Sequence, residues 1–233
     1  MITYQTFADS PRKIALTAGI FYLLTFVSIP TLSLYSSVHD PNYIVGPGTD
    51  TNVFIGVILE LIVALTGIGS AVALYPLLKK QNASVALGLV GARVLEAATI
   101  FTGAAFLLAI VTLRQSGIGA EGLVTGKALV TLYDRIFLIG QGLIPAVDDL
   151  LLGYLLYKSK LVPRILSIIG LIGVPMLVAG NISVLFGILG QRDPSTFLFA
   201  VPVAVFEFSL GVLLVVKGFN PSAPLILSSK TNR

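Results

Sequence analysis

Residues 53–78 read VFIGVILELIVALTGIGSAVALYPLL, and this stretch decides the fold. Its only charged residue is Glu60. An α-helix rises about 1.5 Å per residue, so the stretch is longer than the hydrocarbon core of a bilayer, which is about 30 Å thick. An apolar run of this length predicts a helix that spans a membrane.

Five more segments of the chain are apolar and long enough to cross a bilayer. The six expected spans are 14–36, 53–78, 84–113, 128–157, 165–189 and 196–216. The composition agrees, because 55% of the residues are hydrophobic and 11% are charged, whereas a soluble domain carries about 25% charged residues. The mean hydropathy is +0.95. We therefore expect an all-α polytopic membrane protein, with six transmembrane helices in a compact bundle and the lipid bilayer as its surroundings.

The spans divide the chain into a single six-helix transmembrane domain, residues 1–217, and a tail, residues 218–233. Asn-Pro and Ala-Pro steps interrupt the tail, which we expect to be flexible. Arg12 and Lys13 precede the first apolar run, as basic residues do in a cleaved signal peptide. No clean small-x-small cleavage site follows, so we interpret the run as an uncleaved helix.

Basic residues in the short loops predict the orientation of the spans, because such residues concentrate on the cytoplasmic side. Ten lysines and arginines lie on the side of the N-terminus, and three, Arg114, Lys127 and Arg192, lie on the other side. This imbalance predicts that both termini, and with them the tail, are cytoplasmic.

The chain has no cysteine and a single histidine, His39. These counts exclude a disulfide, a thiolate metal site, an iron–sulfur cluster and a bis-histidine haem within one chain. We expect no cofactor and no bound metal. The formal net charge is +4, but the basic residues flank membrane spans, so we expect no nucleic-acid partner. We interpret His39 and Asp40 as solvated turn residues in the loop after the first span.

Three glutamates lie on stripes of small residues that follow the helical repeat. The stripes are Gly56, Glu60, Ala64, Gly67 and Ala71 in the second span, Gly88, Ala92, Glu96, Thr99 and Gly103 in the third, and Ala200, Ala204, Glu207 and Gly211 in the sixth. Small residues let helix backbones approach closely in membranes, so each stripe predicts a packing face. We therefore expect the three carboxyls to point into the bundle rather than into lipid.

Polar residues of the fourth span repeat every seven residues, at Asp134, Gln141 and Asp148, and are predicted to share one face. Asp149 is rotated by about 100° from Asp148 around the helix. This aspartate pair also fits a position near the inner interface of the membrane. The Gly-Gln-Gly sequence around Gln141 is expected to loosen the helix.

Acids outnumber basic residues within the spans, because six acids face only Arg93 and Arg135. Arg93 is three residues before Glu96 and can pair with it, and Arg135 is placed to reach Glu60, Asp134 or the outer interface. A charge within lipid costs about 2.5–3.5 kcal/mol, so the unpaired carboxyls are expected to hold a proton or to face a water-filled cavity. Prolines at positions 30, 145, 175 and 202 favour such a cavity, because each tends to kink its helix. The alternative is that the buried acids only join helices.

Six sequence segments form a pattern that extends over nearly the whole chain. They are ALYPLLKKQN (73–82), ARVLEA (92–97), LLLGYLLYKS (150–159), LVPR (161–164), EFSLGV (207–212) and VKGF (216–219). The pattern resembles a large bacterial family of six-helix membrane proteins, catalogued as domain of unknown function 4386. The resemblance implies this fold and a place in the bacterial cytoplasmic (inner) membrane, and it implies no established activity. Similar proteins often read His-Asp-Trp where this chain has Tyr133, Asp134 and Arg135, so a histidine-based mechanism would not carry over.

The acid-rich core suggests three functions. The first is binding or transport of a small molecule or cation, with a small organic cation or a proton as the favoured guest. The residues that would form its site are Glu60, Arg93, Glu96, Asp134, Gln141, Asp148 and Glu207. The second is an intramembrane enzyme that acts on a lipid or isoprenoid, with paired carboxyls as acid and base. The third is a non-catalytic subunit or sensor, in which the buried charges only fix the packing. We favour the first, and thus a role other than catalysis. The small-residue stripes pack equally well within one chain or between two copies, so a homo-oligomer stays open.

Overall fold

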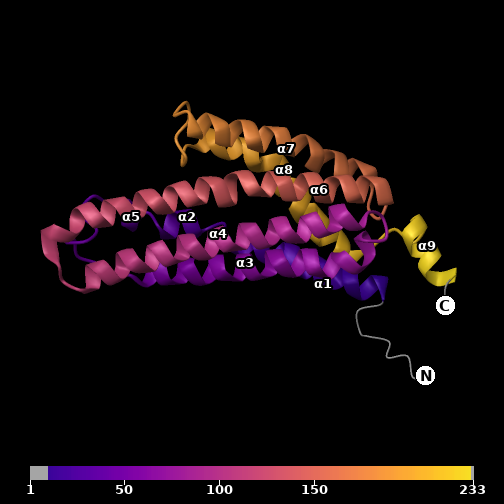
Figure 1. Cartoon of the computed structure of the whole chain (residues 1–233), viewed down its shortest axis with the longest axis horizontal. Coiled ribbons are helices and arrows are strands. Elements are labelled where there is room, and N and C mark those ends of the chain that lie inside the picture. Colours follow the sequence, from indigo (N-terminus) through magenta and orange to yellow (C-terminus); the bar gives the residue numbers. More distant parts are fainter. Residues whose placement is uncertain (1–9, 232–233) are drawn as a thin grey trace, which may run out of the picture.

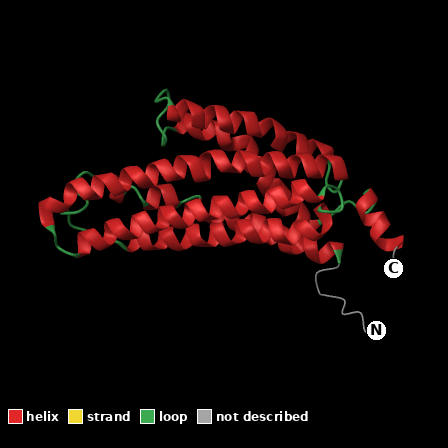
Figure 2. Cartoon of the chain, in the orientation of Figure 1, coloured by secondary structure: helices red, strands yellow, loops and turns green. Residues whose placement is uncertain are grey.

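The protein is a bundle of long helices, and the part that the computed structural model describes, residues 10–231, contains no strand (Figure 2). The long helices are α1 (Pro11–Thr25), α3 (Thr51–Leu78), α4 (Ala83–Gln115), α5 (Gly122–Phe137), α6 (Ile144–Ser159), α7 (Arg164–Leu185) and α8 (Pro194–Val216). The short helical segments are η1 (Phe26–Ser28), α2 (Thr31–Leu34), η2 (Ser37–His39), η3 (Gly119–Glu121), η4 (Leu138–Leu143) and α9 (Pro224–Thr231). Six stretches of helix are long and apolar enough to cross a membrane, which confirms the expected fold class.

The six spans form a closed ring in the order of the sequence. The helix α3 packs against α1 and α4, and α6 packs against α4 and α7. The helix α8 packs against α7 and also against α1, which closes the ring. The first residues of α1 and the helix α9 lie at the same end of the bundle, which we call the terminal end, and the opposite end is the distal end (Figure 1).

Glycines allow the closest contacts between neighbours in the ring. A Cβ atom at Gly19 of α1 would lie 2.9 Å from the carbonyl oxygen of Gly211 in α8. A Cβ atom at Gly170 of α7 would lie 2.7 Å from Cδ1 of Phe206 in α8. Any side chain at these positions would push the helices apart, so small residues set the spacing of the ring, as is typical of helix pairs in membranes.

The predicted packing stripes hold for one helix and fail in part for two others. All five stripe residues of α3 are buried. On α4 the stripe is turned outward at Gly88, which is exposed, and Arg93 lies on the buried face instead. On α8 the buried face contains Phe206 and Leu210, while Glu207 lies at its edge. Of the small residues in this stripe, Gly211 is buried against α1, whereas Ala200 and Ala204 are only partly buried.

The fourth span is not one continuous α-helix. The π-helical segment η4 joins α5 to α6 and contains the Gly-Gln-Gly sequence, so the helix is loosened where expected. A π turn holds one residue more than an α turn, and this extra residue rotates the following helix by about 100°. Asp134 precedes η4 and Asp148 follows it, so the expectation that they share one face is wrong.

The chain after the sixth span folds back onto the terminal end instead of forming the expected flexible tail. The helix α9 lies there, and Ala223 and Ile226 are buried together with Leu161 of the α6–α7 connection. The backbone N–H of Asn220 donates to the carbonyl oxygen of Leu161 over 2.8 Å. Apolar side chains spaced along 219–226 explain the difference, because they cover the core where the helices of the ring end.

Arg114, at the end of α4, holds the loop between the first two spans at the distal end. Its guanidinium donates to the carboxylate of Asp50 and to the carbonyl oxygens of Gly46 and Gly48. The hydroxyl of Tyr43 donates to the same carboxylate over 2.6 Å, and burial raises the pKa of this hydroxyl to about 12. Asp50 is therefore the point at which this turn-rich loop is fixed to α4.

The carboxylate of Asp50 makes the loop sensitive to acid. Burial raises the pKa of Asp50, but hydrogen bonds from Tyr43, Gln115 and Arg114 outweigh burial and leave the pKa below its ordinary value of 3.8. A group with a lowered pKa stabilises the fold above its ordinary value, and this contribution is lost as the pH falls through the folded value. We expect Asp50→Asn to lower the free energy of unfolding by about 1–3 kcal/mol at neutral pH, and the deficit to shrink in strong acid. Thermal unfolding in detergent, followed by circular dichroism, would measure this, with the exposed Glu121→Gln as control. A deficit that is the same at every pH would contradict the prediction.

Candidate functional site

A crevice of about 240 Å³ lies at the centre of the ring, and every span contributes to its wall. The lining residues are Thr25, Phe26, Ser28 and Ile29 from the first span, Val63 from α3, Arg93 and Glu96 from α4, Gln141 and Pro145 from the fourth span, Leu177 from α7, and Ala200, Val203, Ala204 and Glu207 from α8. Apolar side chains form most of the wall. Six lining residues are polar, and the sequence predicted four of them as site residues, namely Arg93, Glu96, Gln141 and Glu207, whereas Thr25 and Ser28 were not predicted.

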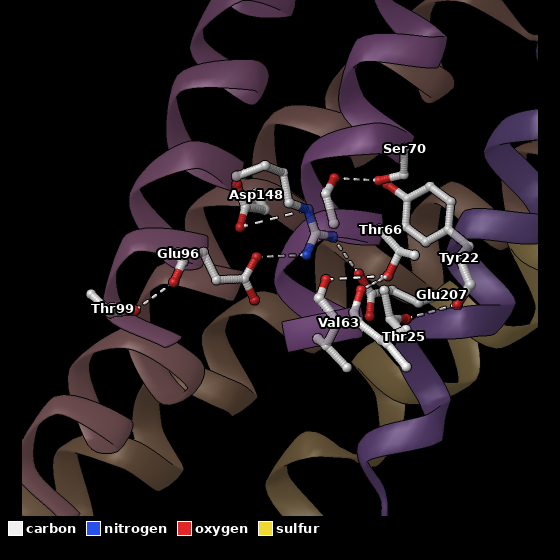
Figure 3. A network of polar contacts seen from close by, with 12 residues as sticks. Tyr22, Thr25, Val63, Thr66, Ser70, Glu96, Thr99, Asp148 and Glu207 are labelled. Atoms are coloured by element: carbon white, nitrogen blue, oxygen red, sulfur yellow. Dashed lines mark hydrogen bonds and ion pairs between the residues drawn. The ribbon is translucent and has the colours of Figure 1, made fainter. Parts of the chain in front are cut away.

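The guanidinium of Arg93 binds carboxyl groups from three helices (Figure 3). Its Nη1 donates to Glu96 over 2.8 Å, and its Nη2 donates to Glu207 over 2.5 Å. Its Nε lies 3.8 Å from Oδ2 of Asp148, an ion-pair distance without a hydrogen bond. The ring of Tyr22 lies 5.8 Å from the guanidinium carbon. Arg93 is 4% exposed, whereas Glu207 is only partly buried, at the crevice.

Local sequence and ring order together produce this arrangement. Arg93 and Glu96 are three residues apart on α4 and therefore lie on the same side of the helix. The helix α4 packs against α6, which brings Asp148 near Arg93. Glu207 comes from α8, and it reaches Arg93 across the centre of the ring, which is possible because its residue lies at the edge of the α8 packing face.

Carboxyl groups exceed positive charge in this cluster. Glu96, Asp148 and Glu207 pair with the single guanidinium of Arg93, and Asp149 is buried next to Asp148. Asp148 and Asp149 are both 0% exposed, and none of their four carboxyl oxygens has a hydrogen-bond partner among the described residues. The cluster would carry three net negative charges if every group were ionised.

Glu60 forms a second buried polar site on α3. Its Oε1 accepts hydrogen bonds from the Tyr133 hydroxyl over 3.2 Å and from Gln141 Nε2 over 3.4 Å. The ring of Tyr35 lies against Gly56, one turn before Glu60. Gln141 therefore touches Glu60 and also lines the crevice, and it is the residue that connects the two polar sites.

Asp134 lies outside the crevice, contrary to the expectation that it lines the core. Its Oδ1 lies 3.0 Å from Nε2 of His39 and 3.8 Å from Nη2 of Arg192, which precedes α8. His39 also lies within 2.5 Å of the Arg192 guanidinium, so it is not the solvated turn residue that the sequence suggested. Arg135 is exposed and forms no ion pair with any residue that the structure describes, so it partners neither Glu60 nor Asp134.

Two glycines of η4 allow the π segment to pack closely against α4 and α7. A Cβ atom at Gly140 would lie 1.9 Å from Oγ1 of Thr99, and one at Gly142 would lie 2.2 Å from Oδ1 of Asn181. The amide of Asn181 donates to the Gly142 carbonyl oxygen over 3.1 Å. The glycines thus bring α4 and α7 close to the polar side of the segment and hold Gln141 at the crevice.

The structure adds residues that the sequence did not indicate. Tyr22, Tyr35 and Tyr133 are almost fully buried beside the acids, and each carries a hydroxyl into the apolar core. Buried tyrosine hydroxyls usually find a partner, so tyrosines inside apolar spans were the available signal. Among the described residues, no group of three or more histidine or acidic side chains is arranged to hold a metal ion.

Residues 17–218 match the family model described as Domain of unknown function (DUF4386). The chain belongs to the DUF4386 family. The match covers all six spans almost completely, and both polar sites lie within it, so the crevice is part of the family domain rather than an addition at either end. No curated protein and no solved structure matches the chain.

Loss of the guanidinium should destabilise the ring more than loss of any exposed charge. Arg93→Met leaves three buried carboxyls without their basic partner, and breaking a buried ion pair on one side costs about 3–5 kcal/mol. The loss should be largest at neutral and alkaline pH and smaller in acid, because protonation then removes the buried negative charge. Thermal unfolding in detergent at several pH values would test this, with the exposed Arg135→Met as the matched control. Equal loss for the two variants would refute the central place of Arg93.

The π segment should not tolerate a single methyl group at its contact with α4. We expect Gly140→Ala to lower the free energy of unfolding by about 1–3 kcal/mol, because overpacking a tight contact has this cost. The second change Thr99→Ala should recover part of the loss, since it removes the atoms that the new Cβ meets. The matched control is Gly91→Ala on α4, where a Cβ meets nothing within 4 Å. Chemical denaturation would measure all three variants, and a Gly140→Ala protein as stable as the control would contradict the described contact.

Proposed function

We propose that this membrane protein binds a small organic cation, or protons in its place, in the crevice at the centre of the ring. The observation that carries the proposal is the excess of acid at the crevice, where Arg93, Glu96 and Glu207 line the wall, Asp148 and Asp149 are buried in the core, and every span contributes. A site lined by all spans suits transport as well as binding, because a shift of any helix changes it.

The electrostatic balance favours a positive guest. Burial of an unpaired charge is costly, and a protein avoids the cost by neutralising the group or by pairing it. Arg93 pairs with Glu96 and Glu207 directly, which leaves the oxygens of Asp148 and Asp149 without hydrogen bonds among the described residues. Protons on these carboxyls or a cation beside them would restore the balance.

The size and walls of the crevice limit the guest. Sites for drug-sized ligands enclose about 300–1,000 Å³, and the crevice, at about 240 Å³, is smaller. Apolar side chains such as Phe26 and Val203 suit alkyl groups, while Glu96 and Glu207 suit a positive centre. A compact quaternary ammonium ion combines both properties, whereas a whole lipid would exceed the volume.

The proposal places the protein in the bacterial cytoplasmic (inner) membrane with both termini in the cytoplasm. Ten basic residues flank the spans on the side of the N-terminus and three flank them on the other side, and this bias sets orientation in membranes. In this orientation the crevice lies between helices that cross the membrane, as the site of a transporter does.

Titration calorimetry with tetraethylammonium chloride would test the proposed function on the purified protein in detergent. We expect saturable binding, and Glu207→Gln should weaken it about tenfold or more, since loss of one buried carboxylate partner costs at least about 1.4 kcal/mol. Glu121→Gln is the matched control, because Glu121 is exposed at the distal end. Sodium chloride at the same ionic strength controls for screening. No saturable binding, or equal affinity in Glu207→Gln and wild type, would refute the proposal.

A further inference from the structure

Glu60 has no positive partner in its buried site. Its residue is 1% exposed, and no described lysine, arginine or histidine forms an ion pair with it. The groups that face the carboxyl are Tyr35 from the end of α2, Tyr133 from α5 and Gln141 from η4, and all three are uncharged amide or hydroxyl groups. A carboxylate in such a place lacks any charge that would compensate for its burial.

Two buried oxygen atoms at this site have no hydrogen-bond partner among the described residues. Oε2 of Glu60 has no partner among the described residues, and neither has the hydroxyl oxygen of Tyr35, which lies beside it. The Tyr35 hydroxyl can serve either state of the carboxyl, because an ionised Oε2 would accept from it and a protonated Oε2 would donate to it. Protonation of Oε2 leaves Oε1 free to accept from Tyr133 and Gln141, as the structure shows.

The packing of Tyr35 against Gly56 and Tyr133 fixes the surroundings of the Glu60 carboxyl. A Cβ atom at Gly56 would lie 2.4 Å from Cε1 and 2.9 Å from the hydroxyl oxygen of Tyr35. The tyrosine ring therefore occupies space that only glycine leaves on α3. The rings of Tyr35 and Tyr133 meet edge to face with centroids 5.6 Å apart, which holds both hydroxyls at the carboxyl.

Gln141 connects this site to the crevice. Its amide nitrogen donates to Glu60 on one side, and its side chain lines the crevice with Arg93, Glu96 and Glu207 on the other. It stands in the π segment between Gly140 and Gly142, where the backbone departs from regular α-helix. Occupation of the crevice would thus act directly on the donor that Glu60 uses.

We propose that Glu60 carries a proton when the crevice is empty, and that entry of a cation into the crevice releases this proton through the link at Gln141. The inference rests on the proposed function and adds the ion that is exchanged. A monovalent cation enters, one proton leaves the carboxyl of Glu60 for solvent, and the net charge of the core stays constant. The resulting carboxylate accepts stronger, charge-assisted hydrogen bonds from Tyr133 and Gln141.

The coupling is reciprocal, so it has two signatures that can be measured separately. If cation binding releases one proton, the affinity for tetraethylammonium should rise about tenfold for each unit of pH over the range in which Glu60 titrates. Independently of any guest, the infrared spectrum of the ligand-free protein should contain the C=O stretching band of a protonated carboxylic acid that belongs to Glu60.

The experiment compares wild type, Glu60→Gln and Gln141→Leu in detergent. The Glu60→Gln substitution keeps the shape of the side chain. Its infrared spectrum should lack the C=O stretching band of Glu60, and its affinity for tetraethylammonium should no longer depend on pH. Gln141→Leu should keep the band and flatten the pH dependence, because only the link is removed. Circular dichroism checks that each variant is folded, and Tyr133→Phe, which removes one donor to the carboxyl, takes the place of Glu60→Gln if that variant does not fold. Tyr133→Phe should then shift the pH at which the band disappears.

The outcomes separate this inference from the proposed function. An infrared band unchanged by Glu60→Gln, or a Tyr133→Phe band with an unchanged midpoint, overturns the proton site. A pH dependence of tetraethylammonium binding that persists in Glu60→Gln or in Gln141→Leu overturns the coupling while the binding site stands. If tetraethylammonium binds to no variant, the proposed function fails and the coupling fails with it, whereas the proton site is still decided by the infrared band.

Discussion

The buried guanidinium of Arg93 is the interaction on which the core of the molecule depends. It holds carboxyls from α4, α6 and α8 in surroundings where an unpaired charge is strongly disfavoured. These three helices must therefore meet at one point, although α4 and α8 are separated around the ring by α6 and α7 on one side and by α1 and α3 on the other. The glycine contacts between α1 and α8 and between α7 and α8 bring the helices close enough for a single arginine to serve all three.

Polar residues of the core form distinct levels rather than one cluster. The Arg93 cluster and the crevice occupy the centre, Glu60 lies beside them with two tyrosines, and Asp134 joins His39 and Arg192 toward the distal end. Only the first level contains a guanidinium among carboxyls in excess, and only the second has an acid without any charged neighbour. Gln141 is a neutral residue, and it connects these two levels because it donates to Glu60 and lines the crevice.

Much of this arrangement can be predicted from the sequence, because membrane insertion leaves strong patterns. Length and hydropathy predict the six spans, and small-residue stripes predict that Glu60, Glu96 and Glu207 face inward. The prediction fails where geometry depends on one backbone step: the π segment separates Asp134 from Asp148, a difference that a seven-residue repeat cannot reveal. It also fails where distant loops meet, as His39 and Arg192 do, because the two residues are 153 positions apart and no periodicity connects them. The fold of 218–231 onto the terminal end was missed for a related reason, since short apolar segments beside prolines resemble linkers.

The single extra residue in η4 sets the direction in which each residue of α6 points. If the segment were regular α-helix, each later residue would move one place along α6, and Asp148 would occupy the present place of Asp149. Val147 would then face the Nε atom of Arg93, where a carboxyl now stands. The adjacent aspartates are therefore not interchangeable duplicates. The π winding of the six residues Leu138–Leu143 determines which aspartate faces Arg93. A deletion or insertion of one residue in this segment would therefore change which side chains face the core, although no charged residue is altered.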